Sequence, residues 1–312
     1  MNSTHRNSHH ENIGMWLGLL GVTIFAITLP MTRLAAGPAS DPQLSPWFIT
    51  FARAALAGAL SIVFLRLTRS PRPTRAQRKP LLYAMLGNAI GFPLLLALAL
   101  RQVSSGHAAV FTALLPLATA VVAAVVLHQR ARTAFWVCAV LGSLLVVGFA
   151  LMRAYQHSGG FGLEWADLLL LGAIVSAALG YVYGAQVTPS LGAERVICWV
   201  CVLALPLTVP GALMTWPDHA VRTSSWLALG YVGVFSMWAG FFAWYRGLAM
   251  GGALRVSQIQ LVQPFISILA AVPLLGEPLE TVTLGFALAV VATVFIGRRF
   301  AMPNPTASSA VK

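Results

Sequence analysis

The chain has 312 residues, of which 58% are hydrophobic and 9% are charged, and its mean hydropathy is +0.79. Soluble domains carry about 25% charged residues, so this composition excludes a soluble enzyme, a disordered regulator and a secreted disulfide scaffold. The 20 Lys and Arg residues outnumber the 8 Asp and Glu residues, which gives a net charge of +12. In such an apolar chain, membrane topology is the first explanation to test for this excess.

Ten segments of the chain are long and apolar enough to be membrane spans. A helix needs about 20 mainly apolar residues to cross a bilayer. We therefore expect an all-α membrane protein with ten transmembrane helices, between polar tails at residues 1–12 and 300–312 that lie in the cytoplasm. The expected helices are residues 13–34, 47–67, 81–100, 108–127 and 134–152 in the first half, and 165–187, 196–214, 226–248, 253–275 and 281–296 in the second.

The basic residues concentrate on one side of this arrangement. If the N-terminus is cytoplasmic, fifteen of the twenty Lys and Arg residues fall in cytoplasmic loops, helix ends and tails, and only four fall on the opposite side. Because cytoplasmic loops are enriched in Lys and Arg, both termini are expected in the cytoplasm. The dense basic stretch from Arg66 to Lys79 could instead bind lipid or nucleic acid. Topology alone explains it, so membrane lipid is an expected partner and nucleic acid is not.

The two halves of the chain are similar at an offset of 148 residues, which places Pro116 on Pro264 and Leu127 on Leu275. Residues 13–152 and 164–299 are therefore predicted to be two repeats of five helices. Because five is an odd number, the second repeat enters the membrane from the opposite side. Inverted repeats of this kind are typical of secondary transporters with a central binding site between the halves.

Several motifs occur in a characteristic order. The second half contains Gly240 to Ala249 (GFFAWYRGLA), then Gln263-Pro264, then Leu275-Gly276-Glu277-Pro278, and the first half has Arg53 and Pro116 in a similar arrangement. From about residue 13 to residue 299 the chain thereby resembles the EamA family of the drug/metabolite transporter superfamily. The resemblance implies a bacterial inner-membrane permease that exports amino acids or other small metabolites.

The first half departs from the family pattern at one place. It has His128-Gln129-Arg130 where the family usually shows Gly-Glu, as in Gly276-Glu277. The acidic residue is therefore present only in the second half, so a symmetrical pair of acids is not expected.

The segment 253–275 offers polar groups near the middle of the membrane. Gln260 and Gln263 are three residues apart and so lie on nearly one face of a helix. Pro264 has no N–H, which leaves the carbonyl of Gln260 without its helical partner. Protein or a water-filled cavity must satisfy such a carbonyl at membrane depth. Since Pro116 marks the equivalent place in the first half, we expect helix breaks that line a cavity; glutamines that only join neighbouring helices are the alternative.

Other polar residues recur at matching depths in the two halves. The offset of 148 places Asn88 on Ser236 and Thr112 on Gln260. These four residues lie on the two proline-bearing segments and on the segment before each. We therefore predict that they bind substrate together with Gln263.

Aromatic and charged candidates complete the predicted site. Trp238 lies close to the depth of Ser236 and could bind an apolar substrate or a cation, and Tyr181 lies in a close-packing Gly180-to-Gly184 pattern. Rings that only pack or face lipid are the alternative. Arg53 is the only charged residue well inside an apolar segment. It could attract a substrate carboxylate, or it could pair structurally or extend toward the outer surface.

The predicted spans contain no Asp or Glu at depth, so a carboxylate proton relay is not expected. Facilitated diffusion is the simplest mechanism, although His107 and His128, at the two ends of segment 108–127, leave proton coupling open. The expected partner is a small-molecule substrate, and a homodimer is left open. No cofactor, metal site or enzymatic activity is expected, because no corresponding motif is present. A nonspecific drug or cation exporter and a membrane-embedded enzyme are the competing classes.

Overall fold

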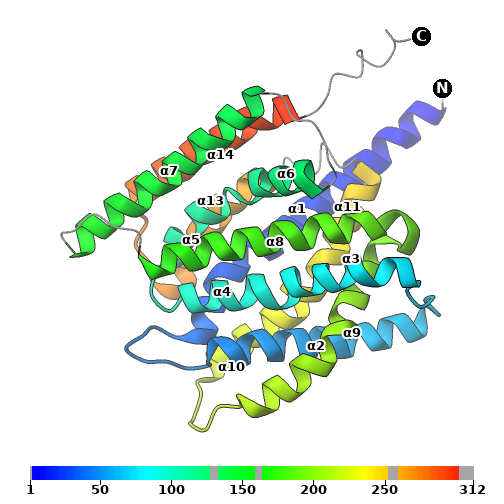
Figure 1. Cartoon of the computed structure of the whole chain (residues 1–312), viewed down its shortest axis with the longest axis horizontal. Coiled ribbons are helices and arrows are strands. Elements are labelled where there is room, and N and C mark those ends of the chain that lie inside the picture. The colour runs from blue at the N-terminus through cyan, green and yellow to red at the C-terminus, as the bar shows by residue number, and fades with distance from the viewer. Residues whose placement is uncertain (1, 127–132, 159–163, 252–258, 302–312) are drawn as a thin grey trace.

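A computed structural model describes residues 2–126, 133–158, 164–251 and 259–301, and the regular elements in these ranges are all helices (Figure 1). The elements of the first half are α1 (Asn2–Ala36), α2 (Pro46–Leu67), α3 (Arg75–Met85), η1 (Leu86–Gly91), α4 (Phe92–Ala99), α5 (Ser105–Thr112), α6 (Leu115–Val126) and α7 (Thr133–Ser158). Those of the second half are α8 (Trp165–Leu191), α9 (Ala193–Met214), α10 (Thr223–Tyr231), η2 (Val232–Ala239), α11 (Gly240–Gly251), η3 (Ile259–Val262), α13 (Gln263–Leu275) and α14 (Thr281–Ala301).

In the part of the chain that the structure describes, seven helical stretches are long and apolar enough to cross a membrane. They are Ile13–Ala36, Pro46–Leu67, Arg75–Ala99, Ser105–Val126, Trp165–Leu191, Ala193–Met214 and Thr223–Trp244. Shorter apolar helices, Trp136–Phe149, Ile259–Leu275 and Thr281–Thr293, lie at the three other expected spans. The expectation of an all-helical, multi-pass membrane protein is confirmed, whereas the count of ten spans stays a prediction.

The helices of one half pack against those of the other in a repeated pattern. The first helix of the first half, α1, packs against α11, and its counterpart α8 packs against α3, η1 and α4. α2 packs against its counterpart α9, and α7 packs against its counterpart α14 at one edge of the molecule (Figure 1). The first helix of each half thus packs against the third span of the other half, which is the arrangement of a two-repeat protein.

The first helices of the two halves run in opposite directions. Near its end, α1 carries Arg33, which donates hydrogen bonds to backbone carbonyls just before α5. The beginning of α8 lies at this same end of the bundle, because Asp167 contacts His107 of α5. The last turn of α8 lies at the other end, where Ser190 accepts a hydrogen bond from Gln77 of α3. The antiparallel course of α1 and α8 is the geometry that inverted repeats require.

The two proline-bearing segments are interrupted at equivalent positions. α6 begins at Leu115 and α13 begins at Gln263, so Pro116 and Pro264 are each the second residue of a helix. A proline in the first turn removes no helical hydrogen bond, because the first N–H groups of a helix have no partner within it. Gln260 lies in the 3-10 turn η3, ahead of α13, so the carbonyl that Pro264 was expected to leave without a helical partner belongs to this turn.

Each of the preceding spans contains a π-helical stretch, η1 in the first half and η2 in the second. The two stretches overlap when they are compared at the offset of 148 residues. Asn88 lies in η1 and Ser236 lies in η2. π-helical turns inside longer helices occur frequently at functional sites. Both halves therefore change their helical geometry at the depth where a polar side chain was predicted to bind substrate.

Glycines allow η1 to approach α8 closely. A Cβ atom on Gly87 would lie 2.4 Å from the carbonyl oxygen of Ser176, and one on Gly180 would lie 2.3 Å from Oδ1 of Asn88. Neither position accepts a larger side chain without movement of its neighbour. This contact between the repeats brings Asn88 and Tyr181, which follows Gly180, to the middle of the bundle.

Candidate functional site: a central cavity between the repeats

A cavity of about 40 Å³, here called the central cavity, lies between the two halves of the protein. This volume has room for about three water molecules. Six of the eight predicted substrate-binding residues line it: Arg53, Asn88, Thr112, Tyr181, Ser236 and Gln263. The apolar part of the lining consists of Phe25, Leu29, Phe92, Leu115, Met237 and Phe241. The lining combines polar groups from both repeats with an apolar wall, which suits a small amphipathic molecule.

Arg53 of α2 is the charged residue of the central cavity. Its side chain is almost fully buried, with 2% of the residue exposed, and its Nη2 donates a hydrogen bond of 3.1 Å to Oγ of Ser236. The Nε and Nη1 atoms have no hydrogen-bond partner among the described residues. The described residues that line the cavity include no Asp or Glu. Arg53 is thus a buried cation without a counter-ion in the cavity, an arrangement that costs several kcal/mol.

Hydroxyl groups connect Arg53 to the first helix. Oγ of Ser236 lies 2.8 Å from Oγ1 of Thr28, so hydrogen bonds join α2, η2 and α1 on one side of the cavity. Thr112 lines the cavity from α5, where its hydroxyl donates to the carbonyl of Ala109 at 3.1 Å. Its oxygen therefore remains available as an acceptor. The cavity thus offers a cationic side next to Ser236 and neutral polar groups elsewhere.

Two of the predicted substrate-binding residues, Trp238 and Gln260, do not line the central cavity. Trp238 packs edge-on against Phe64 of α2, with the ring centroids 6.3 Å apart. Side chains two positions apart on a helix do not share a face. Because Ser236 lines the cavity, the Trp238 side chain points away from it. Gln260 lies one turn before Gln263, along η3. A position along the helix does not by itself place a side chain in a cavity, so the roles of both residues in substrate binding stay predictions.

The Gly-Glu motif of the second half builds a contact that the sequence did not reveal. Gly276 ends α13 with a left-handed backbone, φ 67°, and the reversed chain directs Glu277 back toward α5. The carboxylate of Glu277 accepts hydrogen bonds from the N–H groups of Ser105 at 2.9 Å and Gly106 at 3.2 Å, and it lies 3.1 Å from Nε of Arg33. We call these four residues, Arg33, Ser105, Gly106 and Glu277, the Glu277 cluster. It joins the ends of both repeats.

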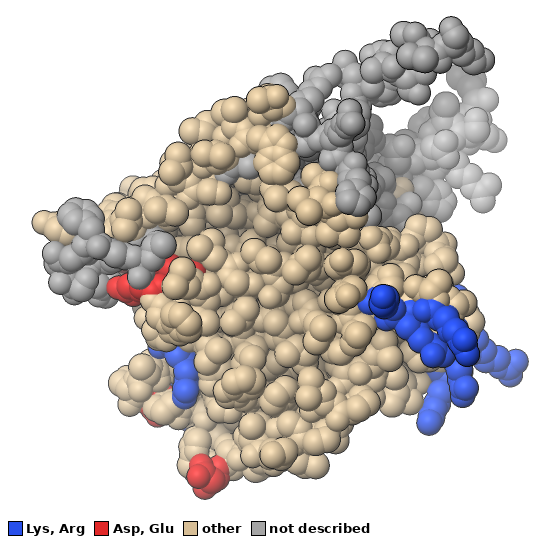
Figure 2. Space-filling model, in the orientation of Figure 1, with Lys and Arg blue, Asp and Glu red and all other residues tan. Residues whose placement is uncertain are grey.

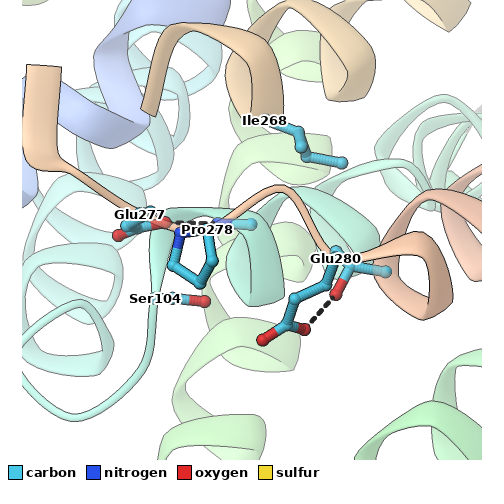
Figure 3. Close-up of a pocket in the computed structure, with 7 residues that line it drawn as sticks. Ser104, Ile268, Glu277, Pro278 and Glu280 are labelled. Atoms are coloured by element: carbon cyan, nitrogen blue, oxygen red, sulfur yellow. Dashed lines mark hydrogen bonds between the residues drawn. The ribbon is translucent and has the colours of Figure 1, made fainter. Parts of the chain in front are cut away.

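A small pocket adjoins the Glu277 cluster (Figure 3). Figure 3 shows Glu277 and Glu280 on the loop after α13, and Ser104 lines the same pocket. Glu277 caps the beginning of α5, and Glu280 accepts a hydrogen bond of 3.0 Å from Thr283. Carboxylates at the N-termini of helices are stabilised by the unpaired N–H groups there. Both acids thus have structural partners.

A buried His–Asp pair also joins the repeats. Nε2 of His107 lies 2.7 Å from Oδ1 of Asp167, and the two residues are 6% and 1% exposed. The other oxygen of Asp167 accepts from the N–H of Glu164 and so caps α8. The sequence placed both residues correctly near span ends, but their pairing across 60 positions carries no local signal. His128, Gln129 and Arg130 lie outside the residues that the structure describes. Within the described ranges, no group of three or more His, Cys, Asp or Glu side chains could hold a metal ion.

An all-helical membrane protein with two antiparallel halves around a polar cavity has the architecture of a membrane transporter. The sequence profile of the EamA-like transporter family matches residues 12–152 and 164–298, once in each half. The chain therefore belongs to the EamA-like transporter family, as its motifs indicated.

Curated relatives of the chain are named as transporters. The chain is 43% identical to "Uncharacterized transporter YdeK" of Bacillus subtilis (strain 168), over 92% of its own length and 97% of the relative. It is 25% identical to "Uncharacterized inner membrane transporter YedA" of Escherichia coli (strain K12), over 86% and 87% of the two chains. It is also 25% identical to a "Probable amino-acid metabolite efflux pump" of Salmonella typhimurium, over 54% of this chain and 58% of the relative.

A solved crystal structure supports the fold. It superposes on the present structure with a TM-score of 0.59 and 20% sequence identity, over 92% of this chain and 97% of the other. At this level of identity the similarity concerns the fold alone. The protein is accordingly a multi-pass membrane transporter of the EamA family, and its relatives agree with the expectation of a transporter rather than an enzyme.

Proposed function

We propose that the protein exports small amphipathic metabolites, amino acids first among them, by alternating access to the central cavity. In this proposal ten helices form two inverted repeats, and a relative movement of the repeats opens the cavity to one side of the membrane at a time. The observation that carries the proposal is the lining of the cavity by residues of both repeats, next to equivalent helix breaks at Leu115 and Gln263.

The size of the central cavity bears on this mechanism. Its volume of about 40 Å³ is smaller than an amino acid requires, whereas ligand sites commonly enclose about 300 Å³ or more. Substrate entry therefore needs the helices around the cavity to separate. The interrupted helices α5–α6 and η3–α13 and the π-helical stretches η1 and η2 are the elements that we expect to change most.

The proposed orientation places both termini in the cytoplasm of a bacterial inner membrane. Lys and Arg residues gather at the end of the molecule where α2 ends and α3 begins (Figure 2), and those from Arg66 to Lys79 are exposed. The central part of this face is free of charged side chains, and acidic residues lie toward its opposite end. The basic end is the proposed cytoplasmic end. The relative named as an inner membrane transporter supports this location.

Transport by the purified protein tests the proposal. Proteoliposomes loaded with unlabelled leucine should accumulate radiolabelled leucine by counterflow, and liposomes without protein should not. Because we propose facilitated diffusion, net leucine flux under an imposed proton gradient should stay unchanged when an uncoupler collapses that gradient. A flux that stops with the proton gradient would contradict facilitated diffusion. Stronger competition by lipophilic cations than by amino acids would favour a nonspecific drug exporter, and absence of transport for all of these compounds would contradict the proposal.

A further inference from the structure

We infer that the central cavity recognises a carboxylate through Arg53, and that its substrates are small organic carboxylates with an apolar body. This inference rests on the proposed function, which it makes more specific. A substrate must then carry a carboxylate, whereas the ammonium group of an amino acid is not needed for binding.

The state of Arg53 in the structure carries the inference. Arg53 is 2% exposed as a residue, and its guanidinium makes one side-chain hydrogen bond, to Ser236, while its Nε and Nη1 atoms have no partner among the described residues. A buried charge without a partner is costly. The planar guanidinium matches the geometry of a carboxylate and forms strong, charge-assisted hydrogen bonds with it. A bound carboxylate would supply the counter-ion that the described lining of the cavity does not provide.

The rest of the lining defines the remainder of the substrate. Phe25, Phe92 and Phe241 present aromatic rings, and Leu29 and Leu115 add aliphatic surface. These side chains suit an apolar body next to the carboxylate. An ammonium group could donate hydrogen bonds to the side-chain oxygens of Asn88 or Gln263, but the described lining contains no Asp or Glu to pair with its charge. A purely cationic ligand would in addition be repelled by Arg53.

The charge in the cavity is also asymmetric between the repeats. The offset of 148 residues places Arg53 of α2 on Cys201 of α9, which is an uncharged counterpart at the same depth. The carboxylate is therefore expected next to α2 and η2, where Arg53 contacts Ser236. The apolar body would then extend toward Phe92 and Leu115, on the side of α4 and α6.

Three probes that differ in one group each test this inference. Leucine has a carboxylate and an ammonium, isocaproate lacks the ammonium, and leucinamide lacks the carboxylate. The full chain is purified in detergent, and the shift of its thermal unfolding midpoint is measured with each probe at equal concentration, since a ligand that binds the folded state raises this midpoint. Leucine and isocaproate should raise the midpoint, and leucinamide should not. Equal shifts with leucinamide and leucine, or no shift with either carboxylate, would overturn the inference.

Substitutions assign the effect to Arg53. Arg53→Gln should weaken the binding of leucine and isocaproate by about tenfold or more, and Arg53→Lys, which keeps the charge but not the planar fork, should recover part of it. The matched control is Arg222→Gln, which removes an exposed arginine paired with Asp41 outside the cavity and should leave both shifts intact. If Arg53→Gln elutes as a folded protein and still binds both carboxylates as the unchanged chain does, the inference is wrong. If Arg53→Gln does not fold, the comparison of the three probes on the unchanged protein decides.

Counterflow separates this inference from the proposed function. If the protein transports leucine, and leucinamide competes as well as isocaproate does, carboxylate recognition fails while the transport function stands. If neither leucine nor isocaproate is transported but both bind through Arg53, recognition stands while transport of these compounds fails.

Discussion

Glu277 is the residue whose contacts explain most about the end of the bundle. Its carboxylate accepts hydrogen bonds from two backbone N–H groups at the beginning of α5 and forms an ion pair with Arg33. The side chain of Arg33 also donates hydrogen bonds to the carbonyls of Leu100 and Val103. One side chain thus fixes the end of α1, the loop before α5 and the loop after α13. The acid that follows Gly276 has this structural role, which needs no proton transfer.

We predict that Glu277→Gln destabilises the protein. The amide keeps the shape of the side chain but loses the charge that Arg33 and the two N–H groups recognise, so the cost should be about 1–3 kcal/mol. A lower midpoint of thermal unfolding in detergent measures it. Asp41→Asn is the matched control, because its ion pair with Arg222 is half-exposed and such pairs contribute about 1 kcal/mol or less. Equal midpoints for Glu277→Gln and Asp41→Asn would contradict this role.

The two glutamines of the second half allow a second comparison at the residue scale. Gln263 lines the central cavity, whereas Gln260, one turn earlier, does not. Gln263→Ala should therefore weaken substrate binding by roughly tenfold, the value of one hydrogen bond. Gln260→Ala should change it little. The Michaelis constant for leucine uptake in proteoliposomes measures both, and a larger effect of Gln260→Ala would mean that the substrate binds elsewhere.

At the scale of single elements, η1 and α8 cross at a close approach between the two repeats. A methyl group on Gly180 would lie 2.3 Å from Oδ1 and 2.5 Å from Cγ of Asn88, so one side chain or one helix has to move. Because the crossing also forms one wall of the central cavity, its packing and the substrate site are coupled.

Gly180→Ala should accordingly cost about 1–3 kcal/mol of stability, the usual range for overpacking, and should reduce transport because Asn88 is displaced. Gly148→Ala in α7 is the matched control: a Cβ there would meet no atom within 4 Å, and alanine is favoured over glycine in a helix by about 0.5–1 kcal/mol. Thermal unfolding and leucine counterflow of the two variants check this. A Gly180→Ala protein that is as stable and active as Gly148→Ala would show that the crossing is looser than the structure indicates.

The sequence predicted the helical elements better than it predicted the directions of side chains. Apolar length located the spans, and the offset of 148 residues brought out Asn88 and Ser236, which both prove to line the central cavity. The direction of Trp238 could not be predicted, because it depends on which face of η2 meets α2. Contacts between Glu277 and α5, or between His107 and Asp167, arise from tertiary packing and have no spacing that a sequence reveals. The left-handed turn at Gly276 that directs Glu277 toward α5 became evident only in the structure.

At the scale of the whole molecule, the protein is a pair of antiparallel repeats that enclose polar groups. Charged side chains lie toward the ends of the face seen in Figure 2, whereas Arg53 lies buried in the middle of the bundle. The Glu277 cluster and the His107–Asp167 pair join the repeats at one end of the bundle. Alternating access requires these contacts to loosen whenever the cavity opens toward that end, so the proposed transport cycle and the stability of this end are linked.

Alternating access to the central cavity is the central claim, and the accessibility of Thr112 tests it most directly. Thr112 lines the cavity, so a Thr112→Cys protein, in which Cys138, Cys198 and Cys201 are replaced by alanine, carries one thiol there. A membrane-impermeant thiol reagent is applied from either side of proteoliposomes in which this protein still transports leucine. We predict that the thiol reacts from both sides, and that leucine slows both reactions. Reaction from one side only, or from neither, in a protein that transports leucine would contradict the account.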